Sequence, residues 1–243
     1  MITVMVAALN EEARLEGTII NLVKSAKQAG SVLLDIVVVD DGSTDRTPQV
    51  IKRLEKRYPF VRSIHHAKNM GIGTGLREVI TIAKYSKFML IPGDNLVAPS
   101  LIKKLFVNRN KAELVISYQL NKEIRTVLRN ILSDLYGLIY MATFNVWIQY
   151  LNSVCIYPTR KLQKIDIKSS RFSICAEMTI KLLRLGCTFY ELPGVYMKVG
   201  LPGSTSISFK NLIEIFSTYL RMIYEIKIVN NHMYKYCPKR VDD

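Results

Sequence analysis

Residues 33–45 read LLDIVVVDDGSTD, an apolar segment that runs into two adjacent aspartates and a turn. The β-branched run at 36–39 predicts a strand buried on both faces, as in a parallel sheet. Asp40 and Asp41 then lie at the carboxyl end of the strand, where open parallel sheets bind ligands. An acidic strand-to-helix turn would also explain residues 40–45, but two carboxylates on one apolar strand favour a binding site.

The segments before and after this strand alternate in type. Residues 2–8 are almost wholly apolar and predict a first buried strand, and the spacing of apolar residues after it predicts a helix that ends near Gly30. Thr47 is expected to be the N-cap of a second helix that runs to about Tyr58, with Pro48 at the first helical position. Strand, helix and strand in this order predict a right-handed parallel crossover.

A short third strand is expected over residues 60–64, followed by a glycine-bearing loop. Asn69 and Gly71 belong to this loop, which opens the next helix and lets backbone amides approach an anion. His65 and His66 precede it without a third metal ligand at useful spacing, so they are interpreted as structural.

A fourth strand, 87–91, ends in Pro92-Gly93-Asp94-Asn95. Asp94 is expected to lie beside Asp41 if their strands are neighbours in the sheet. A carboxylate that faces a diphosphate needs a bridging cation, because two anions otherwise repel each other. Mg²⁺ or Mn²⁺ bound by Asp94 together with substrate phosphates would satisfy both groups.

Composition narrows the class of protein and its partners. The 243 residues, 49% of them hydrophobic, contain no linker or repeat and predict one domain. A formal net charge of +14 implies an anionic partner such as a nucleotide diphosphate, a nucleic acid or an acidic membrane, although solvated lysine-rich helix faces explain much of the excess. No basic stripe is interleaved with aromatic residues, so no nucleic-acid partner is expected.

The cysteines and the N-terminus point to a compartment. The four cysteines are widely spaced without a CxxC pair, which argues against a zinc site or a disulfide framework and fits a reducing cytosol. No basic region precedes the apolar residues 2–9, so no signal peptide is expected. A cytoplasmic protein is the resulting expectation.

The order of four short motifs resembles the family 2 glycosyltransferases, which have the GT-A fold. These motifs are Ala8-Leu9-Asn10-Glu11, Val39-Asp40-Asp41-Gly42-Ser43-Thr44-Asp45, Asn69-Met70-Gly71-Ile72-Gly73 and Pro92-Gly93-Asp94-Asn95. The resemblance implies an α/β protein with a Rossmann-like, mostly parallel sheet flanked by helices. It implies one GT-A domain over 1–230, with a nucleotide-sugar half at 1–100 and an acceptor half at 101–210, followed by an amphipathic helix and basic tail at 211–243.

The resemblance also assigns site residues. The nucleotide-sugar donor would lie across the first, second and third motifs and Gly93, with the contacts at Ala8, Asn10, Glu11, Asp40, Asp41, Asn69 and Gly71. The family's DxD metal motif falls on residues 92–94, where Pro92 replaces the first aspartate and leaves Asp94 as the single metal carboxylate.

The second half resembles the polyprenyl-phosphate (dolichyl-phosphate) sugar synthases and related polysaccharide-assembly enzymes. Arg129 with Ser133 fits their Arg-x-x-x-Ser pattern, and residues 171–177 fit a region ending in a motif glutamate, Glu177. Gly203-Ser204-Thr205-Ser206 matches a closing loop. The family has an arginine where this chain has Gly200, so either Lys198 takes over that phosphate contact or no residue does.

Two acceptors remain open, with different catalytic needs. A lipid phosphate is already ionised and needs no base. Asp94 with its metal would then hold the donor, while Arg129 and Lys198 would orient the acceptor. In-line attack would invert the configuration of the anomeric carbon. A sugar hydroxyl would need a base, for which Glu177 is the candidate. Glu177 is equally well explained as a carboxylate stabilised by a helix N-terminus. Because Pro92 breaks the metal motif, a catalytically silent nucleotide-sugar-binding protein is the alternative.

Two segments bear on membrane contact. Residues 132–151 are mostly apolar but are interrupted by polar side chains, which predicts two helical pieces near the acceptor rather than a membrane span. Residues 211–230 form an amphipathic helix whose apolar stripe packs on the core or lies on an anionic membrane. Flanking cations favour peripheral membrane association, namely Lys210, Arg221, Lys227, Lys235, Lys239 and Arg240.

Overall fold

The computed structural model describes residues 1–171, 173–197 and 209–242, without the side chains of 209–212. The contacts expected of Lys198, Gly200 and Gly203-Ser204-Thr205-Ser206 lie outside the described residues.

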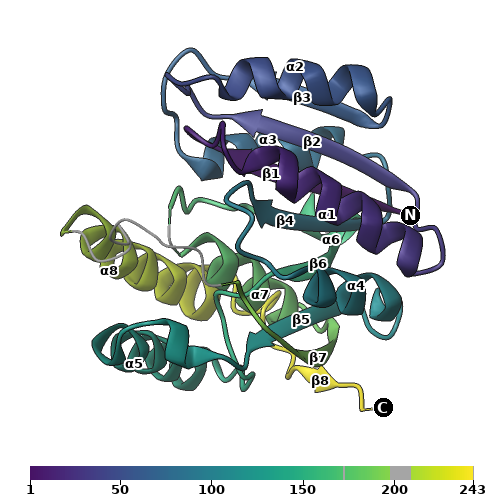
Figure 1. Ribbon diagram of the computed structural model, residues 1–243. Helices are drawn as coiled ribbons and strands as arrows, with labels where there is room; N and C mark the ends of the chain where they lie inside the picture. The colour runs from purple at the N-terminus through teal and green to yellow at the C-terminus, as the bar shows by residue number, and fades with distance from the viewer. Residues whose placement is uncertain (172, 198–208, 243) are drawn as a thin grey trace.

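An eight-stranded sheet runs through the described part of the chain in the order β3-β2-β1-β4-β6-β5-β7-β8 (Figure 1). Neighbouring strands are parallel except where β6 pairs antiparallel with β4 and β5. The strands are β1 (Ile2–Ala8), β2 (Leu34–Asp40), β3 (Val61–His65), β4 (Lys87–Pro92), β5 (Leu114–Gln119), β6 (Cys155–Pro158), β7 (Thr188–Gly194) and β8 (Lys239–Arg240). The expected mostly parallel sheet is therefore confirmed.

The winding direction reverses at β1. The chain runs outward from β1 to β2 and β3 and then returns to place β4 on the other side of β1. The expectation that Asp94 lies beside Asp41 is therefore wrong, because β1 separates the two strands that carry these residues. The crevice at such a reversal is where open α/β sheets bind ligands, and here it opens between the carboxyl ends of β1 and β4.

Helices cover both faces of the sheet and enclose two apolar cores. One core lies under α1, α2 and α4, and the other lies under α3, α5, α7 and α8. These helices and the shorter ones are α1 (Leu15–Gln28), α2 (Thr47–Arg57), α3 (Ile72–Ile82), α4 (Pro99–Asn108), η1 (Lys122–Ile124), α5 (Val127–Phe144), α6 (Thr159–Leu162), α7 (Ile174–Arg184), α8 (Phe209–Ile223) and the π-helix η2 (Tyr224–Val229). The layers follow from strands such as β2, whose residues are all buried and need cover on both faces.

Two local expectations need correction. Thr47 is not an N-cap, because its hydroxyl accepts a hydrogen bond from the Glu11 amide at 2.8 Å, while Asp45 accepts from the Thr47 amide at 2.9 Å. Residues 132–151 do not form two helical pieces. A single helix, α5, covers residues 132–144 of this range and ends where Asn145 adopts a left-handed conformation with φ 50°, so residues 145–151 lie beyond it.

The helices α5 and α8 lie side by side near the edge of the molecule (Figure 1). The Tyr140 hydroxyl donates to the Ile215 carbonyl at 3.0 Å, and the hydroxyls of Thr143 and Tyr219 are 2.7 Å apart. Both helices leave large apolar side chains exposed to solvent. Among the described residues, no helix has the length and apolarity that crossing a membrane requires.

Candidate active site

The loops that follow β1 and β2 are joined side by side at the carboxyl edge of the sheet. The Asn10 amide donates to the Ser43 hydroxyl at 2.9 Å, and the Asn10 side-chain oxygen accepts from the Thr44 amide at 2.8 Å. Asn10 has φ 57°, a left-handed conformation that asparagine tolerates better than most residues. The motif residues at 43–44 therefore fix the shape of the neighbouring motif around Asn10.

A second pair of contacts strengthens this junction. The Glu12 amide donates to Asp45 at 3.1 Å, and the Glu12 carboxylate accepts from the Arg46 amide at 2.8 Å. Hydrogen bonds from Thr47 and from the Glu12 amide outweigh burial and lower the pKa of Asp45. The two contacts of Glu12 were not anticipated from the sequence, because each joins residues more than thirty positions apart.

Asp40 and Asp41 use their carboxylates to hold neighbouring loops. Asp41 accepts from the amides of Met70 and Gly71 at 2.8 Å and lies 2.7 Å from the His66 ring. Asp40 accepts from the Ser43 amide at 3.0 Å and lies 3.0 Å from the ring of His65. Asp41 thus orients residues 69–73, here named the glycine loop, and its contact with a donor base stays a prediction.

The glycine loop packs directly against the backbone of residues 166–170, here named the support segment. The Gly73 amide donates to the Ser170 carbonyl at 3.3 Å. A Cβ atom on Gly73 would lie 2.4 Å from the Ser169 carbonyl oxygen, and one on Gly71 would lie 3.1 Å from that of Ser170. Gly71 also has φ 86°, which favours glycine. Asn69 closes the loop by accepting from the Gly71 amide at 3.1 Å.

Gly93 sets the position of Asp94 beside β1. Its amide donates to the Ala7 carbonyl at 2.8 Å, and its carbonyl accepts from the Thr18 hydroxyl at 3.0 Å. The Ala8 carbonyl next to this contact accepts from the Asp41 amide at 2.9 Å. The backbone around Ala8 and Gly93 therefore connects the two sides of the crevice.

Asp94 and Glu11 follow the neighbouring strands β4 and β1, and the charge of Asp94 acts on Glu11. Burial raises the pKa of Asp94, partly offset by the Leu96 amide and by Arg14. Burial and the nearby charge of Asp94 raise the pKa of Glu11, again partly offset by Arg14. Two partly buried carboxylates that repel each other form a site that a cation would stabilise.

The residues present fit a metal ion that binds together with a diphosphate. Within the described ranges, no group of three or more acidic, histidine or cysteine side chains could hold a metal ion unaided. Magnesium and manganese need only one or two protein carboxylates when substrate phosphates complete their coordination. Asp94 and Glu11 meet that requirement without the aspartate that Pro92 replaces.

Glu177 lies away from solvent, in the first turn of α7. It accepts from the Ser169 amide at 2.7 Å and pairs with Lys181 at 2.8 Å, and both side chains are 0% exposed. Burial alone would raise the pKa of Glu177, but Lys181 and the Ser169 hydrogen bonds outweigh it and lower that pKa. A buried, paired carboxylate with a lowered pKa is a poor proton acceptor, so this placement favours a positioning role over a catalytic base.

Arg129 belongs to a cationic group at the start of α5. Burial and the neighbouring Arg125 lower the pKa of Arg129, while Tyr150 opposes that change. The Tyr150 hydroxyl accepts from Arg125 at 3.0 Å and from Ser133 at 3.3 Å. The predicted Arg129 and Ser133 are therefore brought together around Tyr150.

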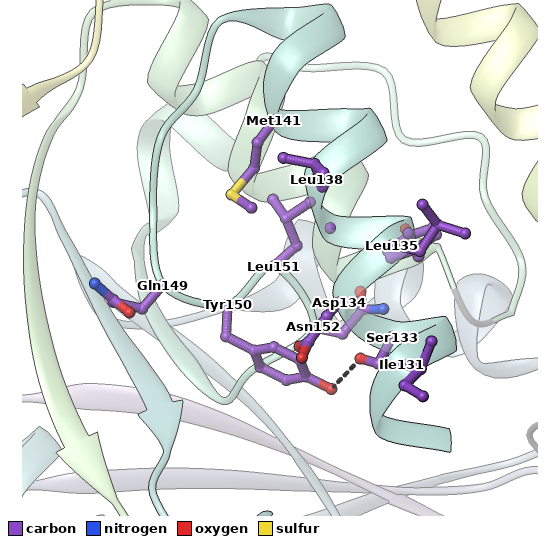
Figure 2. Close-up of a pocket in the computed structure, with 12 residues that line it drawn as sticks. Ile131, Ser133, Asp134, Leu135, Leu138, Met141, Gln149, Tyr150, Leu151 and Asn152 are labelled. Carbon is purple, nitrogen blue, oxygen red and sulfur yellow. Dashed lines mark hydrogen bonds between the residues drawn. The ribbon is translucent and has the colours of Figure 1, made fainter. Parts of the chain in front are cut away.

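A groove of about 560 Å³ runs along α5 from this group (Figure 2). Its wall opposite the helix is formed by residues 149–152. Figure 2 shows Leu138, Met141 and Leu151 at one part of the groove and the Ser133–Tyr150 hydrogen bond at another. The groove therefore has an apolar part and a polar end at Ser133 and Tyr150, where Arg125 contacts the Tyr150 hydroxyl, and Asp134 is the charged residue in its lining.

Comparison with known proteins settles the family. The family model described as glycosyl transferase family 2 matches residues 3–157, which is more than half of the chain. The chain belongs to glycosyl transferase family 2. The expected family, the GT-A fold and the assignment as a glycosyltransferase are thereby confirmed.

Curated relatives cover part of this chain. A dolichyl-phosphate beta-glucosyltransferase of Trichomonas vaginalis is 30% identical over 148 residues, which are 56% of this chain and 45% of the relative. An uncharacterised protein of Methanocaldococcus jannaschii is 30% identical over 153 residues, 58% of this chain and 64% of the relative. The chain thus spans about half the length of the dolichyl-phosphate glucosyltransferases it matches.

Solved structures share the fold at low sequence identity. TarS 1–349 of S. aureus, in complex with UDP-GlcNAc, has a TM-score of 0.65 at 16% identity and covers 96% of this chain and 69% of its own. The mannosyltransferase PcManGT of Pyrobaculum calidifontis, in complex with GDP-Man and Mn²⁺, has a TM-score of 0.64 at 18% identity. The match covers 90% of this chain and 64% of PcManGT. These structures show that related folds hold nucleotide sugars, in one case together with manganese.

Proposed function

We propose that this glycosyltransferase moves a sugar from a nucleotide-diphosphate donor to a lipid phosphate, of the polyprenyl-phosphate type, with inversion at the anomeric carbon. The observation that carries the proposal is the groove along α5, which is apolar along part of its length and has Arg125 and Arg129 beside Tyr150 at its polar end. An amphiphile with a phosphate head and a hydrocarbon chain has the matching distribution of charge and apolar surface. The dolichyl-phosphate relative supports the same acceptor class.

The donor and the acceptor would lie on opposite sides of one segment. The Ser170 carbonyl contacts the glycine loop, and the Ser173 hydroxyl adjoins Tyr136 in the wall of the groove. The donor would lie over the glycine loop and the crevice at Glu11 and Asp94. Ser170 and Ser173 are three positions apart in the chain, so the donor and the acceptor would lie close together, which is the main contribution of an enzyme that joins two bound substrates.

The protein groups have distinct tasks in this reaction. Asp94 and Glu11 would hold Mg²⁺ or Mn²⁺, which when bound neutralises charge on the donor diphosphate as the nucleotide leaves. Arg129 and Arg125 would orient the acceptor phosphate through charge-assisted hydrogen bonds. The phosphate oxygen is ionised at neutral pH, so the reaction needs no protein base. The burial of Glu177 supports this acceptor over a sugar hydroxyl, which would need such a base.

The donor half is tested by thermal-shift measurements with UDP, GDP, CDP and dTDP, each with and without Mn²⁺. We expect one nucleotide to raise the melting temperature by several degrees, only with the metal, and Asp94→Asn to abolish the effect. Asp242→Asn is the matched control, because Asp242 has the same chemistry but is 88% exposed and lies near the end of the chain. No shift with any nucleotide would contradict the donor site.

The acceptor half is tested by turnover. A short polyprenyl phosphate should accept the sugar from the identified donor, and the corresponding polyprenol should not, because only the phosphate is ionised. The anomeric configuration of the product, read by NMR, should be opposite to that of the donor. Binding of the nucleotide without turnover on any phosphate acceptor would favour the catalytically silent alternative, which the substitution of Pro92 in the metal motif suggests.

We further propose that the exposed faces of α5 and α8 lie on an anionic membrane surface, from which a lipid acceptor would enter the groove. Large apolar side chains are exposed along α5, for example Leu128 at 63% and Leu135 at 51%, and along α8, for example Phe216 at 64%. The net charge of +14 favours an anionic surface. Leu135 and Leu138 belong both to the lining of the groove and to the exposed apolar side chains of α5, so the proposed acceptor site adjoins this face.

A further inference from the structure

A cluster of four charged side chains is packed between α7, α8 and η2, outside the groups that would touch substrate. Lys181 lies at its centre and is fully buried. Its ammonium group contacts the carboxylates of Glu177 and Glu225, each at 2.8 Å. The Arg221 guanidinium completes the cluster at 3.4 Å from Glu177. Lys168, which is 45% exposed, lies at the edge of the cluster, 3.7 Å from Glu225.

The cluster holds the backbone of the support segment. Glu177 accepts from the amides of Ser169 at 2.7 Å and Lys168 at 3.2 Å. Lys181 donates to the Asp166 carbonyl, and Arg221 donates to the Ser169 hydroxyl at 3.2 Å. Three of its charged side chains are therefore directed at the support segment.

The other side of the support segment carries the glycine loop. Besides the bond between Gly73 and Ser170, Arg77 of α3 reaches the carbonyls of Ile167 and Ser169 at 3.4 Å each. A Cβ atom on Gly73 would lie only 2.4 Å from the Ser169 carbonyl oxygen, which shows that the two backbones are in contact. A movement of the support segment would therefore displace the glycine loop.

We infer that Glu177 and Lys181 are positioning residues for donor binding, which hold the support segment so that it presses the glycine loop into its donor-binding shape. The inference rests on the proposed donor role of the glycine loop. It assigns to Glu177 a task that requires a buried, ionised carboxylate, since two backbone amides and a lysine all need an acceptor at that point. The cluster also makes this shape depend on α8 and η2, which supply Arg221 and Glu225.

Stability alone is a weak reason for such a cluster. Replacing a buried ion pair by apolar side chains of similar volume is often neutral or stabilising, because the pair has to be removed from water. Removing one partner leaves a buried charge and is strongly destabilising. The informative variant therefore removes the two fully buried charges together, as in Glu177→Gln combined with Lys181→Met. It leaves Glu225 with Lys168 at 3.7 Å and leaves Arg221, which is 31% exposed, to solvent.

The test compares this double variant with wild type by hydrogen exchange of the full chain without ligand. We expect amide protection to fall about tenfold in the support segment and, as the distinguishing result, also in the glycine loop. The matched control is Asp35→Asn with Arg62→Met. Asp35 is 3% exposed and pairs with Arg62 at 2.9 Å near the amino end of β2, far from the carboxyl edge. This control should leave both segments protected.

The affinity for the nucleotide found in the thermal-shift panel gives the functional readout. The double variant should bind it about tenfold more weakly, a change of ~1.4 kcal/mol, while the control binds as wild type does. Unchanged protection of the glycine loop, or unchanged nucleotide affinity, would overturn the inference. If wild type itself bound no nucleotide, the proposed donor site would fall, whereas the exchange data would still decide whether the cluster holds the loop.

Discussion

Single atoms decide the packing of Gly73. A Cβ atom there would lie 2.4 Å from the Ser169 carbonyl oxygen and 2.7 Å from the Ser170 Cα, which are backbone atoms that cannot rotate away. Gly73 is the second residue of α3, where alanine would otherwise improve helix propensity by up to about 1 kcal/mol. The clash outweighs this gain, because forced overpacking costs roughly 1–3 kcal/mol.

We therefore expect Gly73→Ala to lower the free energy of unfolding by about 1–2 kcal/mol. It should also weaken nucleotide binding, because it separates the glycine loop from the support segment. Gly137→Ala is the control. Gly137 is also helical, but its added Cβ would meet only the end of Met141 at 3.6 Å, an ordinary contact. Denaturant unfolding and nucleotide titration of both variants check the prediction, and similar behaviour of the two would contradict it.

His66 links stability to pH. Its ring lies 2.7 Å from Asp41 and 3.0 Å from Glu78, and these carboxylates outweigh burial and raise the pKa of His66. The raised pKa means that the folded state binds a proton more tightly than the unfolded state does. The resulting stability is complete below the ordinary histidine pKa of about 6.5 and is lost as the pH rises through the folded value.

We expect the melting temperature of wild type to exceed that of His66→Gln by the largest margin near pH 6 and by a smaller margin at pH 9. Glutamine can hydrogen-bond but does not titrate, so the difference isolates the proton. The control is His232→Gln, because His232 is exposed near the end of the chain. A margin that stayed constant or grew with pH would contradict the sign derived from the pKa of His66.

Among the elements, α5 differs most from its sequence-based interpretation. The polar interruptions within residues 132–151 suggested two helical pieces, but a helix tolerates polar residues wherever they face water or a partner. Asp134 faces solvent and pairs with Lys122 at 2.8 Å, and Asn145 ends the helix instead of interrupting it. Residues 211–230 were expected to present an apolar stripe either to the core or to a membrane. The structure places part of that stripe in the core, where Met222 and Ile226 are buried.

The exposed face of α5 is tested by vesicle flotation. We expect Leu128→Glu with Leu135→Glu to weaken partition onto phosphatidylglycerol vesicles at least tenfold, because each buried leucine contributes about 2 kcal/mol. The control is Leu33→Glu with Val107→Glu, which makes the same change in charge at side chains 58% and 55% exposed on other elements. Equal loss in both variants would indicate a purely electrostatic contact, and wild-type protein that stays off the vesicles would exclude the membrane proposal.

In the proposed reaction, three regions of the chain would meet at one site. The crevice comes from the reversal of winding at β1 and the groove from α5, while the support segment contacts the glycine loop beside the crevice. The strands β2 and β4 point toward the side on which α5 and α8 lie (Figure 1). A donor at the carboxyl edge and an acceptor beside α5 would therefore meet without a large movement of either half.

Much of this architecture was predictable, because the relevant signals act over a few residues. The apolar run of β2 requires burial on both faces, and the chain direction then places Asp40 and Asp41 at the edge where ligands bind. The ordered motifs gave the family for the same reason, since each is a contiguous loop after a strand. The positive φ of Gly71 is local to one loop, whereas the space that Gly71 and Gly73 need is set by Ser169 and Ser170, about a hundred positions away.

The remaining features depend on partners distant in sequence. Strand order placed β1 between β2 and β4, so the strand that carries Asp94 neighbours β1, which leads to Glu11, and not β2, which leads to Asp41. Packing of α7 against α8 and η2 buried Glu177 with Lys181, which changes the carboxylate from a candidate base into a support for backbone amides. Propensity and periodicity describe how one segment folds, whereas side-chain burial and ion pairing are properties of several segments packed together.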